Sequence, residues 1–367
     1  MIRKNMNFVY ILTLLLLAAC VKETVPNAVV PPVYGEQDTF IRAVDISSYP
    51  EIKAVNPVFY GSDSVATDFL AILKAKGVNT IRLRLWVNPS NQQSGFVEVK
   101  QFAEELKRNG FKIWLSVHYS DTWADPGHQQ LPSVWQNASY TALKDSVYNY
   151  TKKVVTQVKP DYIQIGNEIN SGFLFPQGNL NTNQANFKEL LQKGIAAVRE
   201  NAPKTKIILH FAGIDNANWF FGNLTALDYD VIGLSYYPIW HGKSLTNLKT
   251  TLTSLSVNYQ KEVVIAETAY PFTLGWNDWT NNIVGLESQL ILPDFPASPT
   301  GQKNYLNSLI KLTKEVPSSK GIGFCYWGAE LIAWKGTQGQ NASVWENQAL
   351  FNFQNHALPV LDEFKVK

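Results

Sequence analysis

The 367-residue sequence has few cysteines and few charged residues. Its two cysteines are Cys20 and Cys325, and this number excludes a framework of disulfides. Cys325 lies in an apolar run, where we expect a small buried side chain. Charged residues make up 17%, the formal net charge is +2, and no long basic run is present. This charge distribution argues against nucleic acid as a partner.

Sequence motifs for several other chemistries are also absent. His118 and His210 show neither HxH nor HExxH spacing, so we expect no catalytic zinc. There is no G-x-S-x-G elbow and no P-loop. We expect that no cofactor is required. A structural calcium ion could still bind in one long loop, whose oxygen-bearing side chains are Asn277, Asp278, Asn281 and Asn282.

Aromatic residues, by contrast, are abundant, at 13% of the chain with 11 tryptophans. Flat rings can fill a core or stack on the apolar faces of sugars, and composition alone does not decide between these uses. Two long connections, 120–136 and 268–300, separate regular segments, and the second contains Trp276 and Trp279. Because long loops on a compact domain are usually functional, we expect these tryptophans to be sugar-stacking platforms.

The first 37 residues are typical of an export signal and a tether. Residues 1–19 combine a positively charged start with a short apolar run, as a signal peptide does. The run ends Leu17-Ala18-Ala19-Cys20, which resembles the bacterial lipobox and predicts a lipid anchor at Cys20. An ordinary secretory signal with a chance cysteine is the alternative. Residues 20–37 contain several prolines and no periodicity, so we expect a flexible tether.

This segment predicts an exported bacterial lipoprotein, placed at the outer membrane or the cell surface. Contact with the membrane would come only through the acyl chains at Cys20, since no spanning helix is expected. The sequence does not separate a periplasmic from an outward orientation. We expect a monomer.

From residue 38 onward, short apolar runs alternate with amphipathic segments. Gly77 and Gly110 each follow an amphipathic segment, where a helix C-cap is expected. Eight strand–helix units predict a single-domain (β/α)8 TIM barrel over residues 38–367. A doubly wound open sheet is the alternative, but the first strand lacks a glycine-rich phosphate turn. The predicted strands are Ile41–Ile46, Thr80–Trp86, Lys112–His118, Tyr162–Glu168, Lys206–Phe211, Val231–Tyr236, Val263–Glu267 and Gly321–Trp327. The predicted helical segments are Thr67–Lys76, Val97–Asn109, Ala142–Val158, Asn186–Asn201 and Lys303–Glu315.

Two of the predicted strands end on a glutamate, Glu168 and Glu267. In a parallel barrel the carboxyl ends of the strands share one face, so these carboxylates should meet in one cleft. A carboxylate pair is what cleavage of a glycosidic bond requires. Either glutamate taken alone could be an ordinary solvated loop residue. Arg82 and Arg84 share a strand face with Trp86 by the period of two. We predict that Arg84 pairs with Glu267 and keeps it ionised, with a core salt bridge as the alternative.

Polar and aromatic side chains also gather where other predicted strands end. The third and sixth strands each end in such a block, and single residues close the fifth and eighth. These side chains suit hydrogen bonds to sugar hydroxyls and stacking on sugar rings. The predicted substrate contacts are Arg84, Trp86, His118, Asp121, Trp123, His210, Tyr236, Tyr237 and Trp327.

Several blocks resemble those of the arabinogalactan endo-β-1,4-galactanases, glycoside hydrolase family 53. They occur in the same order, from about Ala43 to Trp334. The blocks are Asp45-Ile46-Ser47-Ser48, Arg82-Leu83-Arg84-Leu85-Trp86-Val87, His118-Tyr119-Ser120-Asp121-Thr122-Trp123-Ala124-Asp125-Pro126-Gly127, Gln164-Ile165-Gly166-Asn167-Glu168-Ile169-Asn170, Gly233-Leu234-Ser235-Tyr236-Tyr237-Pro238 and Glu267-Thr268-Ala269-Tyr270-Pro271.

The resemblance implies a (β/α)8 barrel of the large retaining clan. Its substrate would be β-1,4-galactan, the side-chain polymer of pectin, cleaved internally. It further implies that Glu168 is the acid/base, that Glu267 is the nucleophile and that Asn167 binds the sugar 2-hydroxyl. Bacterial members often carry a calcium-binding loop after strand seven, and residues 273–279 do not reproduce it. Two other interpretations stay open: another glycosidase of this clan, such as a mannanase or cellulase, and a lipid-anchored sugar-binding protein with an inactive barrel.

Overall fold

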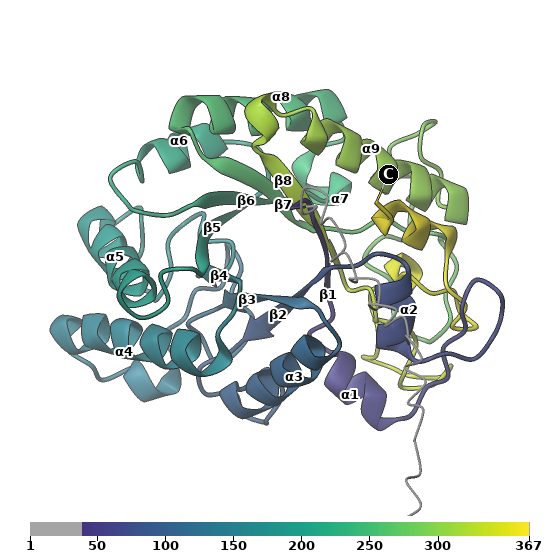
Figure 1. The fold of residues 1–367 in the computed structure, drawn as a ribbon, viewed down its shortest axis with the longest axis horizontal. Coiled ribbons are helices and arrows are strands. Elements are labelled where there is room, and N and C mark those ends of the chain that lie inside the picture. The colour runs from purple at the N-terminus through teal and green to yellow at the C-terminus, as the bar shows by residue number, and fades with distance from the viewer. Residues whose placement is uncertain (1–38, 367) are drawn as a thin grey trace, which may run out of the picture. The chain divides into compact units, whose positions relative to one another are not determined.

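In a computed structural model, which describes residues 39–366, eight parallel strands close into a barrel in chain order. Each strand pairs with its neighbours in sequence, and β1 closes the ring against β8. Figure 1 shows the helices outside the ring of strands. The predicted TIM barrel is confirmed. Its strands are β1 (Ile41–Asp45), β2 (Thr80–Leu85), β3 (Lys112–Val117), β4 (Tyr162–Ile165), β5 (Lys206–Ala212), β6 (Val231–Ser235), β7 (Glu262–Thr268) and β8 (Gly321–Trp327).

The helices of the described chain include all five predicted ones and four that the sequence analysis did not predict. One of the four, between β6 and β7, is rich in threonine, serine and asparagine, which favour helices weakly. Leu248, Leu252 and Leu255 nevertheless recur on one face, and burial of that face against the barrel stabilises the helix. The helices are α1 (Tyr49–Ala54), α2 (Phe69–Ala75), α3 (Phe96–Arg108), α4 (Tyr140–Val158), α5 (Gln184–Asn201), α6 (Ala217–Gly222), α7 (Pro238–His241), α8 (Leu245–Tyr259) and α9 (Pro299–Lys314).

Local signals explain where several helices begin and end. The side chains of Asp68, Ser139 and Ser298 each accept a hydrogen bond from a backbone N–H in the first turn of the helix that follows. Gly77 and Gly110 adopt φ values of 97° and 77° directly after the C-caps of α2 and α3. The predicted C-cap glycines are therefore confirmed, since this left-handed conformation favours glycine.

The barrel interior changes character along its axis. At the amino-terminal end it holds an apolar cluster that includes Trp114, Tyr162 and Cys325, and all three side chains are buried. Above this cluster, buried polar side chains replace apolar ones, among them Asp45, Arg82, Ser116, Gln164 and His210. Such groups are costly to bury unless they are paired, so this polar layer marks the end of the barrel where chemistry is expected.

Strand β4 ends earlier than the sequence predicted, at Ile165 rather than at Glu168. Gly166 and Glu168 both lie in the left-handed region, with φ values of 87° and 46°. A Cβ on Gly166 would lie 2.4 Å from Cγ2 of Ile169, so glycine is needed there for space as well as for conformation. The sharp turn directs Asn167 and Glu168 over the mouth of the barrel, where a continued strand would alternate their directions.

The predicted signal peptide at 1–19 and the lipidation site at Cys20 lie outside the described residues, as does the 20–37 tether. Among residues 39–366, no helix combines the length and the hydrophobicity that crossing a membrane requires.

The Gly166 turn leads to a stability prediction. We expect Gly166→Ala to lower the free energy of unfolding by more than the roughly 1–2 kcal/mol of a left-handed alanine, because its Cβ also clashes with Ile169. Gly242→Ala is the matched control, since Gly242 has φ 84° but a Cβ added there would meet no atom within 4 Å. Denaturant unfolding of both variants measures the difference, and equal losses would contradict the steric argument.

Candidate active site

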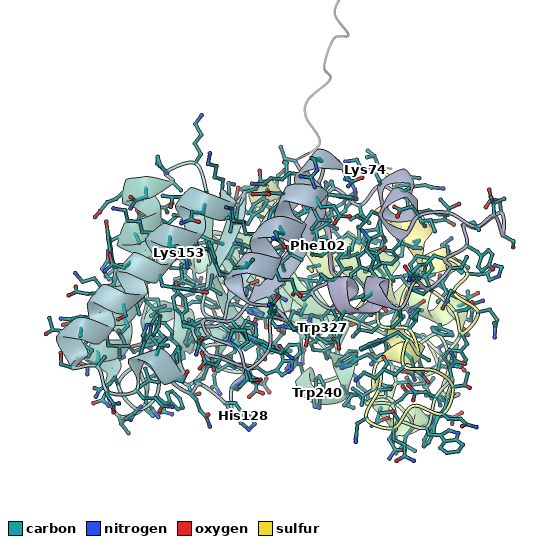
Figure 2. The ribbon with its side chains drawn as sticks, turned by 90° about the horizontal axis from the view of Figure 1, so that it is seen from below. Lys74, Phe102, His128, Lys153, Trp240 and Trp327 are labelled. Atoms are coloured by element: carbon teal, nitrogen blue, oxygen red, sulfur yellow. The ribbon has the colours of Figure 1, made fainter. Side chains whose placement is uncertain are left out.

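A cavity of about 420 Å³ opens at the carboxyl ends of the strands. Figure 2 shows Trp240 and His128 along this edge of the molecule and Trp327 deeper, on the Trp240 side, with Lys74 toward the opposite edge. The predicted site residues that line the cavity are His118, Trp123, Asn167, Glu168, Tyr237, Glu267 and Trp327. The fold thus gathers side chains from β3, β4, β6, β7, β8 and their loops at one cavity.

The two glutamates face each other across this cavity. One carboxylate oxygen of Glu168, one of Glu267 and a ring nitrogen of His210 all lie within 4.8 Å of one another. Both nitrogens of His210 already have protein partners, Gln164 at Nδ1 (2.8 Å) and Ser235 at Nε2 (2.9 Å). We therefore interpret the group as a carboxylate pair supported by a histidine rather than as a metal centre.

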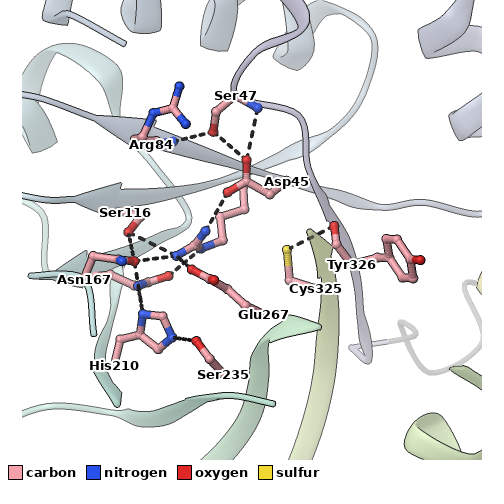
Figure 3. Close-up of polar contacts among 12 residues, drawn as sticks. Asp45, Ser47, Arg84, Ser116, Asn167, His210, Ser235, Glu267, Cys325 and Tyr326 are labelled. Carbon is pink, nitrogen blue, oxygen red and sulfur yellow. Dashed lines mark hydrogen bonds and ion pairs between the residues drawn. The ribbon is translucent and has the colours of Figure 1, made fainter. Parts of the chain in front are cut away.

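Arg82, from β2, holds one member of this pair. Its Nη2 donates to Oε1 of Glu267 at 2.7 Å, and Nη1 donates to Oδ2 of Asp45 at 2.6 Å. The same guanidinium also donates to Gln164, Asn167 and Ser116, with distances of 2.7, 2.9 and 3.2 Å. Figure 3 shows Glu267, Asn167, Ser116 and Asp45 arranged around these contacts. Tyr237 donates its hydroxyl to the other oxygen of Glu267 at 3.0 Å.

Glu168 has no cation partner among the contacts of the described residues. Its Oε1 accepts a hydrogen bond from the hydroxyl of Ser235 at 2.5 Å, and Ser235 in turn contacts Nε2 of His210. Burial lowers the pKa of His210 well below its usual value, so the ring is neutral. Since Nδ1 accepts from the Gln164 amide, Nε2 carries the hydrogen and donates to Ser235. A chain of three hydrogen bonds from β4, β5 and β6 thus orients the Glu168 carboxyl.

These surroundings separate the two pKa values. Burial, followed by the negative charge of Glu267, raises the pKa of Glu168 to about 8. Burial also raises the pKa of Glu267, but the Arg82 cation and the hydrogen bond from Tyr237 oppose that rise. These surroundings favour the proton on Glu168 and the negative charge on Glu267. One acid and one carboxylate in a single cavity is the arrangement that glycosidic bond cleavage uses.

Comparisons with known proteins identify related chains. Residues 41–364 match the model of "Glycosyl hydrolase family 53". The chain is 34% identical to "Arabinogalactan endo-beta-1,4-galactanase" of Cellvibrio japonicus over 90% of this chain and 92% of that protein. It is 30% identical to "Endo-beta-1,4-galactanase" of Bacillus subtilis over 92% of this chain and 88% of that protein.

The chain belongs to glycosyl hydrolase family 53. A solved family 53 catalytic domain from Ignisphaera aggregans superposes with a TM-score of 0.84 and 37% identity, covering 91% of this chain and 98% of that one. A fungal β-1,4-galactanase structure gives a TM-score of 0.77 at 29% identity, covering 88% of this chain and 98% of that one. This chain is therefore a glycosidase by family, with the fold of its solved relatives.

The predicted pairing of Arg84 with Glu267 is wrong. Arg82 makes that contact, while Arg84 points away from Glu267 (Figure 3) and donates from Nε to Ser94 at 2.9 Å. The Arg84 guanidinium lies between two indoles, 4.5 Å from the ring centroid of Trp86 and 4.0 Å from that of Trp123. It therefore supports the cavity wall from behind through cation–π contact.

Four other predicted contact residues also lie outside the cavity lining. Trp86 packs edge-on against Trp123, and His210 lies beneath the glutamates. Asp121 accepts hydrogen bonds from the backbone N–H groups of Asn88 and Ser133 and so ties two loops together. Tyr236 is buried on the helix side of β6 and donates to the carbonyl of Gly242. In the structure these residues position others rather than face the cavity.

His118 is one predicted residue whose environment defines a donor. Its Nδ1 accepts the backbone N–H of Ala124 at 3.0 Å, so Nε2 carries the ring hydrogen. Burial and the nearby charges of Arg84 and Arg82 lower the pKa of His118 well below its usual value. The ring is therefore neutral and can offer one N–H to a hydroxyl in the cavity.

Several lining residues are not among the predicted substrate contacts. Asp125, Trp240, His241 and Trp345 all face the cavity. Asp125 lies in the His118–Gly127 block, and Trp240 and His241 follow closely after Tyr237, so the sequence placed these three near predicted residues. Trp345 comes from the connection after β8 and carries no local signal. Its ring centroid lies 4.7 Å from that of Trp327, a contact that only the fold creates.

The loop proposed for calcium is joined to the β8 loop by direct hydrogen bonds. Asp278 is buried, and its two oxygens accept the backbone N–H groups of Thr280 and Ser343 at 2.6 and 3.2 Å. The side-chain nitrogen of Asn277 donates to the carbonyl of Phe353 at 3.3 Å. Each carboxylate oxygen of Asp278 therefore already accepts one backbone hydrogen bond. The calcium ion stays a prediction.

The raised pKa of Glu168 predicts a pH-dependent stability. A carboxyl whose pKa is about 8 in the folded chain and 4.5 in the unfolded chain costs nothing below pH 4.5. The cost grows as pH rises from 4.5 to 8, because the folded state then holds a proton that the unfolded state has released. We therefore expect Glu168→Gln to raise Tm relative to wild type, by an increment that widens between pH 4.5 and 8.

Thermal unfolding across this pH range measures the increment. Glu104→Gln, a change on the exposed surface of α3, is the control and should follow the wild-type curve. A Glu168→Gln increment that is constant with pH would contradict the stated protonation of Glu168.

Proposed function

We propose that this family 53 chain is an endo-acting, retaining β-1,4-galactanase that cleaves galactan side chains of pectin. The observation that carries the mechanism is the carboxylate pair, whose facing oxygens lie within 4.8 Å. Retaining glycosidases separate their carboxyl groups by about 5–5.5 Å, whereas inverting enzymes leave roughly 6.5–9.5 Å for a water molecule. A spacing this short is closer to the retaining range and favours direct attack by one carboxylate.

In the proposed reaction, Glu267 is the nucleophile and Glu168 the acid. An electron pair of the Glu267 carboxylate forms a bond to the anomeric carbon while Glu168 transfers its proton to the departing glycosidic oxygen. Arg82 and Tyr237 hold Glu267 ionised and fixed in place. The sugar is then an ester of Glu267, and the leaving chain departs with the proton.

Formation of this ester changes the protonation of Glu168. Esterified Glu267 has no negative charge, and that charge is one of the two main causes of the raised pKa of Glu168. The pKa of Glu168 therefore falls, so that Glu168 is ionised when a water molecule enters. It removes a proton from the water as the water oxygen bonds to the anomeric carbon. The bond from that carbon to Glu267 breaks, its electron pair returns to the Glu267 carboxylate, and the sugar leaves with its original configuration.

Support for a galactan substrate comes from the names of the relatives and from the cavity wall. Two relatives that align over most of this chain are named as galactanases. Trp123, Trp327 and Trp345 line the cavity and can stack on the apolar faces of sugar rings. His118 offers an N–H to hydroxyls, and Asn167, held by Arg82, is the group proposed to contact the 2-hydroxyl.

The proposed cellular location, oligomeric state and calcium ion rest on the sequence. The lipobox-like Leu17–Cys20 supports an exported lipoprotein anchored through Cys20 at the outer membrane or cell surface. There the enzyme would meet polymer that is too large to enter the cell. A monomeric state and a structural calcium ion after β7 belong to the same proposal.

A substrate panel tests the proposed specificity. We expect reducing-sugar release from linear β-1,4-galactan to exceed that from β-1,4-mannan and cellulose, and internal cleavage should yield mixed oligosaccharides early in the reaction. Faster release from mannan or cellulose would favour another glycosidase of the same clan. Tight binding of galactan with no cleavage would instead identify a sugar-binding protein with an inactive barrel.

Azide and a pair of variants test the roles of the glutamates. Glu168→Ala should slow turnover of galactan by about 10²–10⁴, since general acid catalysis is lost. On an aryl β-galactoside, whose leaving group needs no acid, added azide should attack the ester from the face that Glu168 vacates and give the β-galactosyl azide. In Glu267→Ala azide replaces the nucleophile, so the α-galactosyl azide is expected. The same anomer from both variants, or inverted product from wild type, would rule out these assignments.

A further inference from the structure

Four basic side chains at the amino-terminal end of the barrel have no partner among the described residues. Arg108 ends α3, Lys112 begins β3, Lys159 caps α4 before β4, and Lys204 lies between α5 and β5. All four side chains are exposed, and none forms a hydrogen bond, ion pair or ring contact within residues 39–366. Because β3, β4 and β5 are neighbours in the barrel, the four lie on one side of its amino-terminal end. We call Arg108, Lys112, Lys159 and Lys204 the basic face.

Several carboxylates at this end of the barrel are already paired with other basic residues. Asp228 and Asp230 both form ion pairs with Arg199, at 2.8 Å each. Glu262 forms an ion pair with Lys206 at 2.6 Å. These pairs offset their own charges and leave the charge of the basic face unchanged.

Asp161 is the carboxylate nearest in sequence to Lys159. Its Oδ2 accepts a backbone N–H from β3 at 2.8 Å, and it interacts electrostatically with Lys107. Lys107 in turn donates to the carbonyl of Lys159 at 2.8 Å, so a lysine outside the basic face offsets the charge of Asp161. Glu104 on α3 and Glu200 on α5 add two negative charges, fewer than the four positive charges of the basic face.

A depression of about 580 Å³ lies within the basic face. Lys159 and Lys204 line it from the connections before β4 and β5, and Asp161 lines it as well. Pro160 and Pro203 contribute apolar surface between the charged groups. Two ammonium groups beside apolar surface suit a ligand that joins a phosphate to an apolar body, as a phospholipid does.

Electrostatic stabilisation of helix ends explains only part of this charge. Arg108 lies in the last turn of α3, where a cation is favourable. Lys112, however, begins a strand, and Lys204 comes after α5 has ended at Asn201. Lys159 adopts φ 52° at the C-cap of α4, a conformation that favours glycine. The lysines at these positions are therefore better explained by binding than by folding.

The loops at the carboxyl ends of the strands have the opposite charge. Within the described chain their basic residues are Lys53, Lys243 and Lys335. Their acidic residues include Asp63, Asp68, Asp121, Asp125, Asp215, Asp278, Glu287 and Asp294. Figure 2 shows both ends, with Lys74 toward the amino-terminal edge and Trp240 at the edge where the cavity opens. The barrel is thus electrically asymmetric along its axis.

The proposed tether joins the barrel at the end that carries the basic face. The described chain starts at Thr39, just before β1, and the amino ends of parallel strands share one face. Flexible chains as long as residues 20–37 span roughly 20–25 Å on average. A lipid anchor at Cys20 would therefore keep the basic face near the membrane.

We propose that the basic face docks on anionic lipid headgroups of the membrane that holds the anchor, with Lys159 and Lys204 binding a headgroup phosphate in the depression. This inference rests on the lipid anchor of the proposed function, and it adds a second membrane contact to the acyl chains that the sequence predicted. Each basic residue near an anionic surface adds attraction. Because the catalytic cavity opens at the other end of the barrel, docking directs it away from the membrane and toward polymer.

The test uses the lipidated full-length chain, reconstituted into vesicles of phosphatidylcholine with or without phosphatidylglycerol. An amine-reactive reagent acetylates exposed lysines, and mass spectrometry gives the rate at each position. We expect Lys112 to react roughly fivefold or more slowly on the anionic vesicles, and added salt should remove the difference. Lys335, in a loop at the carboxyl ends, should react at the same rate on both.

Two double variants with the same change of charge separate the two ends of the barrel. Lys159→Gln with Lys204→Gln should remove most of the protection of Lys112 on anionic vesicles. Lys243→Gln with Lys335→Gln is the matched control and should leave that protection intact. Both variants should cleave galactan in detergent as the wild-type chain does, which confirms that they are folded.

Three outcomes would overturn the proposal. One is equal acetylation of Lys112 on neutral and anionic vesicles. Another is protection that survives Lys159→Gln with Lys204→Gln, since the anchor alone would then cover this face. The third is stronger protection of Lys112 by polygalacturonate in detergent than by anionic vesicles, which would identify an acidic polysaccharide as the ligand instead.

Failure of this inference can be told apart from failure of the proposed function. Mass spectrometry that finds no acyl group on Cys20 would remove the anchor from the proposed function, and the docking with it. An acylated chain whose Lys112 reacts equally on both kinds of vesicle would remove only the docking.

Discussion

The buried guanidinium of Arg82 is the contact on which the catalytic face depends. It lies in the polar layer of the barrel and bonds to side chains of β1, β3, β4 and β7 and of the turn after β4. A buried cation is stable only if it is paired and its donors are satisfied. Asp45 and Glu267 supply the negative charges, so removal of either would leave part of the guanidinium without its charged partner.

The pairing of Arg82 also gives the two glutamates different hydrogen-bond partners. Arg82 and Tyr237 stabilise the ionised form of Glu267, whereas Glu168 receives only a hydroxyl donor from Ser235. Burial, together with the resulting charge on Glu267, then raises the pKa of Glu168. One asymmetric contact therefore makes two chemically identical side chains an acid and a carboxylate, and the neutral His210 beneath them adds no competing charge.

A second buried arginine, Arg84, supports the tryptophans that line one side of the cavity. Arg84 stands between Trp86 and Trp123, and a series of indole contacts continues from Trp123 to Trp327 and Trp345. The β8 loop that carries Trp345 is joined to the β7 loop by Asp278 and Glu346. Arg82, Asp45 and Glu267 thus lie on strands and Glu168 lies in the tight turn after β4, while the surfaces suited to sugar stacking come largely from loops fastened to one another.

The sequence by itself determined the barrel, because eight apolar runs with helices between them allow few other architectures, and it determined that Glu168 and Glu267 would meet. Periodicity could not separate Arg82 from Arg84, since residues two apart share a face. Depth separates them: Arg82 lies beside Asp45 in the strand register, while Arg84 lies two residues nearer the mouth among loop side chains. The end of β4 was likewise decided by the Gly166 turn, and Trp345 reached the cavity only through the packing of loops distant in sequence. The alternation along a strand predicts whether a side chain points into or out of the barrel. Which side chains it then contacts depends on how the barrel closes.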